Sequence, residues 1–265
     1  MAKVIATAVQ KGGCGKTTTT HTLGVGLGMK GYKILLVDAD AQCNLSSVSD
    51  IDISNNKTLY EVMKGEVEPQ DAIHHTKYYD IISGSLNMAR ADTEFTKEPY
   101  IMNCFYLMKE QIDKVKDNYD FVFIDTPPAL SITTQNALVC CDSILVPTQA
   151  DSFCINGLAN LKSQIDLIKQ RTTNKALKIE GILLTKYSER TRLNQILRDE
   201  LFKVASLLET KVYRYAVRES VAVRESQTLK SCVLIENAQN IASIDYQCFI
   251  NEFEEDNRKS VKENE

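Results

Sequence analysis

The run Gln10-Lys11-Gly12-Gly13-Cys14-Gly15-Lys16-Thr17-Thr18 limits the possible folds more than any other part of the chain. It lacks the first glycine of the usual G-x-x-x-x-G-K-[ST] pattern, because position 10 is Gln. The remaining glycines still let backbone N–H groups turn toward phosphate oxygens, and Lys16 and Thr17 are the types that contact phosphate and Mg²⁺. An apolar run at 3–9 precedes the loop, and a helical pattern from Thr17 to Lys30 follows it. The sequence therefore predicts a phosphate-binding loop between a strand and a helix.

Two further predicted strands end in carboxylates. An apolar run from Lys33 leads into Asp38 and Asp40, and a second run from Tyr119 leads into Asp125. In a parallel sheet the carboxyl ends of the strands lie at one edge, where ligands bind. Both acidic groups are therefore expected beside the phosphate-binding loop.

These motifs, in this order, resemble those of the ParA family of partition ATPases, and the resemblance runs from about residue 2 to about 252. It rests on Lys-Gly-Gly-x-Gly-Lys-Thr-Thr at 11–18, Asp-x-Asp-x-Gln-x-Asn at 38–44, Asp-x-Pro-Pro at 125–128, and Glu180-Gly-Ile-Leu-Leu-Thr185 followed by Glu-Arg190-Thr. The resemblance implies an α/β fold: a single-domain P-loop NTPase with a mostly parallel twisted sheet and helices on both faces. This domain would span 1–253, and 254–265 would form a charged, flexible tail.

The resemblance also implies which residues hold ATP and Mg²⁺, the two expected cofactors. The metal would be held by Thr17 and Asp125. Asp38 would support Mg²⁺ or Lys16 indirectly, without contacting the nucleotide. Ala41 stands where the family usually has Pro, a change that removes no functional group. The nucleotide-binding residues would be Lys11, Gly12, Gly13, Cys14, Gly15, Lys16, Thr17 and Thr18.

Three residues carry the implied catalysis: Lys11, Lys16 and Asp40. A carboxylate of ordinary pKa aligns a water molecule better than it removes a proton, so Asp40 suits a slow ATP hydrolase. In the family two subunits sandwich two ATP molecules, and Lys11 would reach the phosphates held by the partner. A cation placed where negative charge develops lowers the barrier, so hydrolysis would require an ATP-dependent homodimer.

The base is expected to be adenine, mainly by resemblance. A guanine site would show Asn-Lys-x-Asp after a strand, whereas the comparable place reads Thr185-Lys186-Tyr187-Ser188. The segment from Val217 to Val221 would build part of the base pocket. Many relatives carry Ile-Pro in this segment, and Arg218 stands in place of the proline.

Charge is distributed unevenly along the chain, although the formal net charge is −4. Residues 178–230 carry 11 Lys and Arg against 7 Asp and Glu, whereas 231–265 carry 3 against 8. A local basic surface can bind the DNA backbone despite a negative total. The resemblance implies nonspecific DNA binding by the ATP-joined dimer, a nucleoid-associated cytoplasmic location, and hydrolysis stimulated by a ParB-type centromere-binding partner. The candidate DNA-binding residues are Arg190, which matches a family arginine, and Arg192, Arg198, Arg218 and Arg224.

Other functions are compatible with parts of this pattern. The same ATPase could position a protein cargo instead of DNA, and the sequence does not separate these two uses. A P-loop tyrosine kinase is disfavoured, because Tyr246 is not part of a terminal tyrosine cluster. A scaffold that binds ATP without hydrolysis is disfavoured by Lys11 and Asp40. The arginines could also be ordinary solvated helix residues with i,i+4 partners.

Composition is consistent with one cytosolic domain, and the resemblance is to the short, Soj-like type of the family. The 265 residues begin directly with the first predicted strand, so an N-terminal helix-turn-helix is not expected. No apolar stretch reaches 18 residues, and the acidic Glu254-Glu255-Asp256 is unlike a basic membrane anchor, so no membrane contact is expected. The eight cysteines contain no C-x-x-C and suit reduced, buried thiols. A disfavoured alternative is an iron–sulfur cluster shared between subunits through Cys104, Cys140 and Cys141.

Overall fold

A computed structural model describes residues 2–54, 57–150, 152–188 and 192–262. Its centre is a sheet of seven strands in the described part of the chain, and their order is β3-β4-β2-β5-β1-β6-β7. All neighbouring strands are parallel except the edge pair β3 and β4. The strands are β1 (Lys3–Thr7), β2 (Ile34–Asp38), β3 (Ile73–His75), β4 (Asp80–Ile82), β5 (Phe121–Asp125), β6 (Ser143–Thr148) and β7 (Lys178–Leu184).

The central strands are buried on both faces, because nearly every residue in them is apolar. Successive side chains of a strand point to opposite faces, so each strand supplies two hydrophobic clusters. In β5, Val122 and Ile124 pack on one face while Phe121 and Phe123 pack on the other. The same alternation places Val4 and Ile5 of β1 in different clusters. Covering both faces of this sheet therefore requires two layers of helices.

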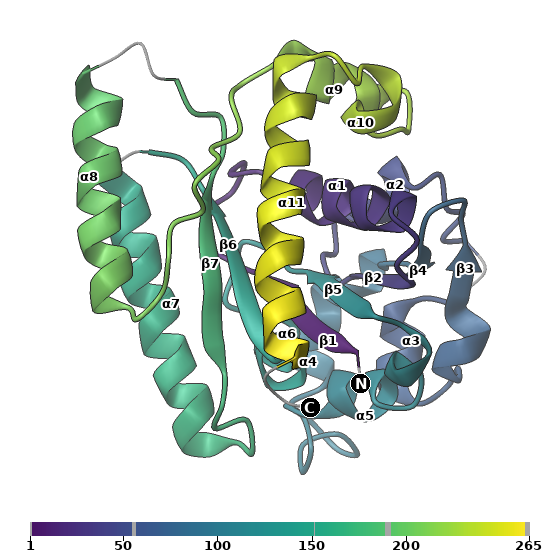
Figure 1. The fold of residues 1–265 in the computed structure, drawn as a ribbon. Coiled ribbons are helices and arrows are strands. Elements are labelled where there is room, and N and C mark those ends of the chain that lie inside the picture. Colours follow the sequence, from purple (N-terminus) through teal and green to yellow (C-terminus); the bar gives the residue numbers. More distant parts are fainter. Residues whose placement is uncertain (1, 55–56, 151, 189–191, 263–265) are drawn as a thin grey trace.

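The helices form these two layers, and α11 crosses the front of the sheet in Figure 1 while α7 and α8 lie together at one side. The α1 layer contains α1 (Lys16–Met29), α2 (Asn44–Val48), α9 (Val221–Thr228), α10 (Val233–Glu236) and α11 (Ile241–Lys262). The opposite layer contains α3 (Leu59–Lys64), α4 (Ala91–Glu94), α5 (Leu107–Ile112), α6 (Ile132–Cys140), α7 (Ser152–Arg171) and α8 (Arg192–Leu207). This arrangement confirms the predicted α/β fold, with a mostly parallel sheet between helices. No helix in the described part of the chain combines the length and the apolar character needed to cross a bilayer.

The C-terminal segment differs from the expected flexible tail beginning at residue 254. Helix α11 continues without a break to Lys262, so residue 253 is not the end of the folded unit. Glu254 is buried, and its carboxylate accepts hydrogen bonds from Lys30 and from the Tyr32 hydroxyl at 2.8 Å. Asn257 is also buried, and it accepts a hydrogen bond from Lys3 at 2.5 Å. The acidic composition suggested a solvated tail, but Lys30, directly after α1, pairs with Glu254, and Lys211 pairs with Asp256.

A buried histidine connects α1 to the residue that precedes β4. His21 is 4% exposed, and its Nε2 lies 3.0 Å from the Tyr79 hydroxyl. That hydroxyl donates its own hydrogen to Ser49 Oγ at 2.9 Å, so Nε2 must carry the hydrogen between His21 and Tyr79. Burial lowers the pKa of His21 from 6.5 to about 4. The folded protein therefore keeps this ring neutral in a range where the unfolded chain protonates it.

We expect His21 to make the fold less stable in mild acid. Between the unfolded pKa near 6.5 and the folded pKa near 4, only the unfolded state binds the proton, so stability is lost as the pH falls through this window. At about pH 5 the loss should be about 2 kcal/mol relative to about pH 7.5. Urea unfolding at both pH values, with His21→Gln as the comparison, measures this contribution. Equal pH dependence in the two proteins would contradict the assignment to His21.

Candidate functional site

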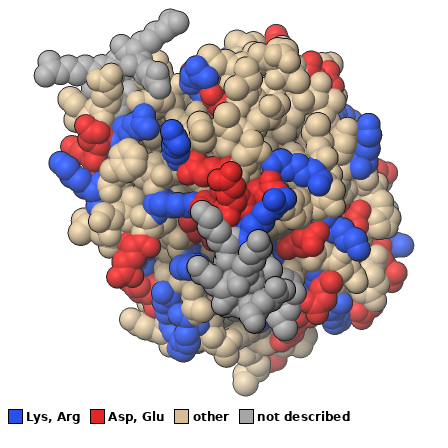
Figure 2. All heavy atoms as spheres, in the orientation of Figure 1, with Lys and Arg blue, Asp and Glu red and all other residues tan. Residues whose placement is uncertain are grey.

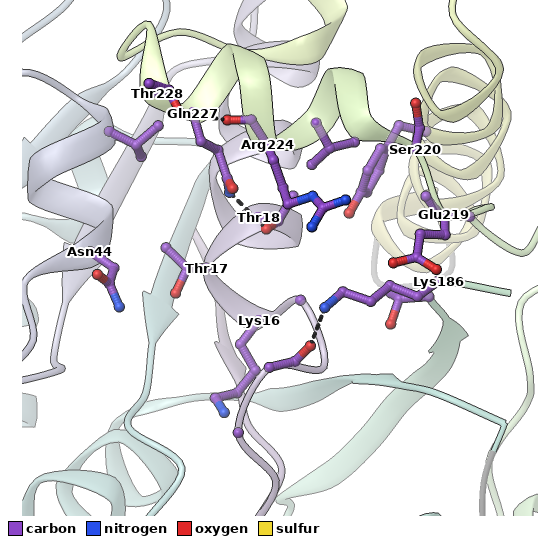
Figure 3. A pocket seen from close by; sticks show the side chains of 18 of the residues that line it. Lys16, Thr17, Thr18, Asn44, Lys186, Glu219, Ser220, Arg224, Gln227 and Thr228 are labelled. Carbon is purple, nitrogen blue, oxygen red and sulfur yellow. Dashed lines mark hydrogen bonds between the residues drawn. The ribbon is translucent and has the colours of Figure 1, made fainter.

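A cavity of about 690 Å³ opens at the carboxyl ends of the strands. The phosphate-binding loop and the start of α1 form one wall, and the segment from Val217 to Thr228 forms the opposite wall (Figure 3). Asp40 and residues at the start of α2 close one end, and Thr185 and Lys186 lie where β7 ends. The cavity therefore occupies the sheet edge at which the sequence predicted a phosphate site.

The phosphate-binding loop has the backbone that its glycines permit. Gly13 and Gly15 have φ values of 72° and 88°, which favour glycine over residues with a side chain. Gly15 caps α1, and no side-chain cap hydrogen bond is present at this helix end among the described residues. An anion is the natural partner for these groups, because the amino end of a helix carries partial positive charge. The loop thus offers backbone donors and a helix end to the same cavity.

Lys16 lies inside this loop, as predicted. Only 7% of the residue is exposed, and its Nζ donates to the carbonyl oxygens of Lys11 at 3.0 Å and Val9 at 3.4 Å. These contacts hold the ammonium group at the base of the cavity. Lys16 is therefore placed to exchange carbonyl partners for phosphate oxygens.

Asp125 and Thr17 meet at the floor of the cavity. The Thr17 hydroxyl donates to Asp125 Oδ2 at 2.6 Å, and Asp125 Oδ1 is buried without a hydrogen-bond partner in the structure. Burial, together with the neighbouring charge of Asp38, raises the pKa of Asp125 to about 8. Such an oxygen needs either a proton or a cation to be stable at neutral pH. Thr17 and Asp125 therefore fit Mg²⁺, which would neutralise phosphate charge when bound with the nucleotide.

Asp38 supports this group from the adjacent strand. Its Cα pairs with that of Asp125 in the register of β2 and β5, so the two carboxylates end neighbouring strands. Asp38 Oδ2 accepts from the backbone N and the hydroxyl of Ser46 at 2.8 and 2.7 Å, and Oδ1 accepts from the backbone N of Asp40 at 3.2 Å. Burial raises its pKa to about 6. Both oxygens are thus used to hold the 40–46 segment, which suits the indirect role expected for Asp38.

Asp40 lines the cavity, although it is only 9% exposed. Its Oδ1 accepts from the backbone N of Gln42 at 3.0 Å, which fixes the carboxylate at the start of the turn. The turn forms with Ala41 where the family has Pro, and Cys43 ends it with a φ of 52°. The carboxylate is therefore held at the cavity without a proline.

Lys11 and Cys14 differ from the other loop residues expected to bind the nucleotide. Gly12, Gly13, Gly15, Lys16, Thr17 and Thr18 line the cavity, whereas Lys11 and Cys14 do not appear among the described lining residues. Cys14 is fully buried, and its thiol donates to the Lys11 carbonyl at 3.3 Å. Any contribution of Cys14 to the cavity is therefore made by its backbone.

The opposite wall is built from α9 and the residues before it. Gln227 Nε2 donates to the Thr18 hydroxyl at 2.9 Å and so joins α9 to α1. Arg218 donates from Nε and Nη2 to the buried Asp245 of α11 at 2.8 and 2.5 Å. The segment from Val217 to Val221, which was expected to contact the adenine base, thus contributes to this wall. Gln227 and Arg224 also line this wall; the sequence carried no signal for Gln227, and it suggested DNA binding for Arg224.

The five arginines predicted to bind DNA do not form one group in the described structure. Arg218 and Arg224 lie at the nucleotide cavity, and Arg218 is paired with Asp245, so these two positions do not favour the predicted DNA contact. Arg198 lies on α8, and its Cζ is 5.7 Å from the centre of the Tyr187 ring and 5.8 Å from the centre of the Phe202 ring. Arg190 lies outside the described residues, and Arg192 begins α8 with a side chain that is not described.

Comparison with known proteins agrees with this geometry. A family model described as an AAA domain matches residues 2–179. Sporulation initiation inhibitor protein Soj of Bacillus subtilis is 35% identical over 229 residues, which cover 85% of this chain and 88% of the relative. Chromosome partitioning protein ParA of Caulobacter vibrioides is 33% identical over 239 residues, covering 88% of this chain and 86% of the relative.

A solved structure adds a ligand-bound example of the fold. Cobyrinic acid a,c-diamide synthase from Mycobacterium smegmatis, with bound ATP analogue and magnesium, matches with a TM-score of 0.81 and 28% identity. The match covers 95% of this chain and 93% of that one. With the strand-end carboxylates, the two-lysine loop and the relatives over most of the length, the chain belongs to the ParA/Soj family of P-loop ATPases.

Proposed function

We propose that this protein is a DNA partition ATPase that binds DNA as an ATP-joined homodimer and releases it on hydrolysis. The observation that carries the proposal is the arrangement of Lys16, Thr17 and Asp40 around one cavity, with the buried Asp125 bonded to Thr17. This arrangement suits Mg²⁺-ATP, and a relative that is 33% identical over 239 residues is named as a chromosome partitioning protein. ATP and Mg²⁺ are the proposed cofactors. A ParB-type centromere-binding protein is the proposed partner that stimulates slow hydrolysis on the nucleoid.

The position of Lys11 supports the dimer. Its neighbours Gly12 and Gly13 line the cavity, while Lys11 itself is absent from the described lining. Its carbonyl is occupied by Lys16 and Cys14, which fixes the backbone at the loop shoulder. A lysine fixed outside its own nucleotide cavity is suited to the phosphates of a second subunit. We therefore propose that Lys11 acts across the dimer interface.

The proposed DNA surface lies at α8 and the segment before it. At the centre of the view in Figure 2, acidic side chains gather with Lys and Arg around them. On α11, Asp256 is paired with Lys211, and the Glu252 carboxylate accepts from the backbone N of Arg214. Such an alternation of charge is a poor match for the phosphate backbone. Arg190, Arg192 and Arg198 are close in sequence and carry the proposed contact instead.

We expect the protein to be retained on unrelated duplex DNA with ATP, and not with ADP or without nucleotide. Retention should fall steeply between about 50 and about 200 mM salt, because each phosphate contact releases counterions. Filter binding across that salt series measures both effects. Retention that is equal in all nucleotide states would contradict a DNA surface formed by the ATP dimer.

The charge reversal Arg190→Glu should abolish ATP-dependent DNA retention and leave ATP binding unchanged. Lys114→Glu is the matched control, because it makes the same change at an exposed lysine beyond α5 that pairs with Glu68. The control should retain DNA within about twofold of the unmodified protein, since exposed pairs contribute little. Equal loss in both variants would indicate only a net-charge effect and would argue against a specific surface at Arg190.

A further inference from the structure

Lys186 immediately follows β7 and reaches the phosphate-binding loop from outside. Its Nζ donates to the Gly13 carbonyl at 2.8 Å, drawn as a dashed line in Figure 3. The residue is exposed and lines the nucleotide cavity. None of the roles assigned above uses this third lysine.

Two other side chains hold the same stretch of loop. Gln149, just after β6, donates to the Gly13 carbonyl at 3.1 Å. Thr185 donates from its hydroxyl to the Cys14 carbonyl at 2.6 Å. Two consecutive loop carbonyls are therefore bonded by residues at the ends of β6 and β7. The strands that carry these donors are rigid parts of the sheet, so the two peptide planes are held in a defined orientation.

The orientation of these peptides determines where their N–H groups point. In a trans peptide the C=O and N–H bonds point in opposite directions. Holding the Gly13 carbonyl toward Lys186 turns the N–H of Cys14 the other way, and Thr185 does the same for the N–H of Gly15. A hydrogen bond from an ammonium group is stronger than one from a neutral donor, and it also polarises the peptide it contacts. The N–H of Cys14 thereby becomes a better donor to an anion.

The backbone at Lys186 is a second, independent observation. Its φ is 50°, a left-handed conformation that costs a residue with a side chain about 1 kcal/mol or more. Glycine would adopt this conformation without that cost. The contact made by the lysine side chain therefore compensates for the backbone strain.

We propose that Lys186 is a positioning residue that orients the Gly13–Cys14 peptide to bind the polyphosphate of the nucleotide. This inference rests on the P-loop ATPase site and is independent of the proposed DNA role. Lys186 acts through the loop, so its contribution should be the same for ATP, ADP and inorganic tripolyphosphate. A lysine that contacted the base or ribose would instead act only on the nucleotides.

The test compares Lys186→Met with Lys175→Met as a matched control. Lys175 is also an exposed lysine that donates to backbone carbonyls, those of Lys169 and Gln170, but it lies beyond α7 and away from the cavity. Lys186→Met should weaken ATP, ADP and tripolyphosphate binding about tenfold each, the low end for a charge-assisted hydrogen bond. KM for ATP should rise by the same factor, with a smaller change in kcat. Lys175→Met should change none of these affinities.

Two further variants separate positioning from a general effect on folding. Lys186→Arg keeps a cationic donor and should recover most of the affinity. Lys186→Asn accepts the left-handed backbone but has no charge, so it should keep the melting temperature and still lose affinity. Unchanged tripolyphosphate affinity in Lys186→Met would overturn the proposal. So would full affinity in Lys186→Asn. Neither result would alter ATP-dependent DNA retention, so failure here is distinguishable from failure of the DNA role.

Discussion

Replacing Lys11 with alanine is expected to lower ATP turnover by about a thousandfold, the lower end for a cation supplied across an interface in phosphoryl transfer. Negative charge develops on the phosphate oxygens in the transition state, and an ammonium group from the second subunit stabilises it. Lys16 remains in place at the base of the cavity, so each protomer should still bind ATP. Steady-state hydrolysis at saturating ATP, together with equilibrium ATP binding, measures the two effects separately.

Mixing two inactive variants shows which subunit supplies the lysine. In a mixed dimer of Lys11→Ala and Asp40→Ala protomers, the first protomer keeps Asp40 and receives Lys11 from the second. If Lys11 acts across the interface, that one site is complete and hydrolysis returns in part. If Lys11 acts within its own protomer, both sites lack an essential group and the mixture stays inactive. An inactive mixture would contradict the proposed role of Lys11, whereas each variant alone serves as the control.

The floor of the site could be predicted from the sequence, because parallel strands end at one edge of a sheet. Asp38 and Asp125 each close an apolar run, and in the structure they are paired in register on neighbouring strands. The loop glycines stand where the backbone has positive φ values, at Gly13 and Gly15. In these segments the local sequence pattern and the chemistry of phosphate and Mg²⁺ binding both indicate the same structure.

Only part of the opposite wall could be predicted. The resemblance placed the segment from Val217 to Val221 beside the nucleotide base, but the other contacts of this wall join distant segments. Gln227 is 209 positions from Thr18, and no local pattern marks it as a partner of α1. Arg218 lay in a basic stretch that suggested DNA, but Asp245 on α11 pairs with it at the nucleotide cavity. Charge counted along the sequence gives no information on which side chains become paired. The same limit explains why the acidic residues from Glu254 were expected to form a tail.

We expect Gly28→Ala to cause the largest loss of stability of any small substitution considered. Gly28 lies in α1, and a Cβ atom there would be 1.9 Å from the carbonyl oxygen of Tyr78. Backbone cannot rotate aside as a side chain can, so α1 or the turn between β3 and β4 must move. The higher helix propensity of alanine offsets about 1 kcal/mol of the strain. The unfolding free energy should still fall by about 3 kcal/mol, and the melting temperature by about 6–12 °C.

Gly157→Ala provides the control, because Gly157 is also a helical glycine. In α7, among the residues that the structure describes, an added Cβ would meet Val9 Cγ2 at an ordinary 3.7 Å and no other atom within 4 Å. This variant should be neutral or more stable by up to about 1 kcal/mol, since alanine favours helix. Thermal and urea unfolding of both variants measures the contrast. If Gly28→Ala were as stable as Gly157→Ala, this result would contradict the close packing of Gly28 in α1 against the Tyr78 carbonyl. Because α1 carries Lys16 and Thr17 at its first turn, a shift of this helix should also weaken ATP binding in Gly28→Ala alone.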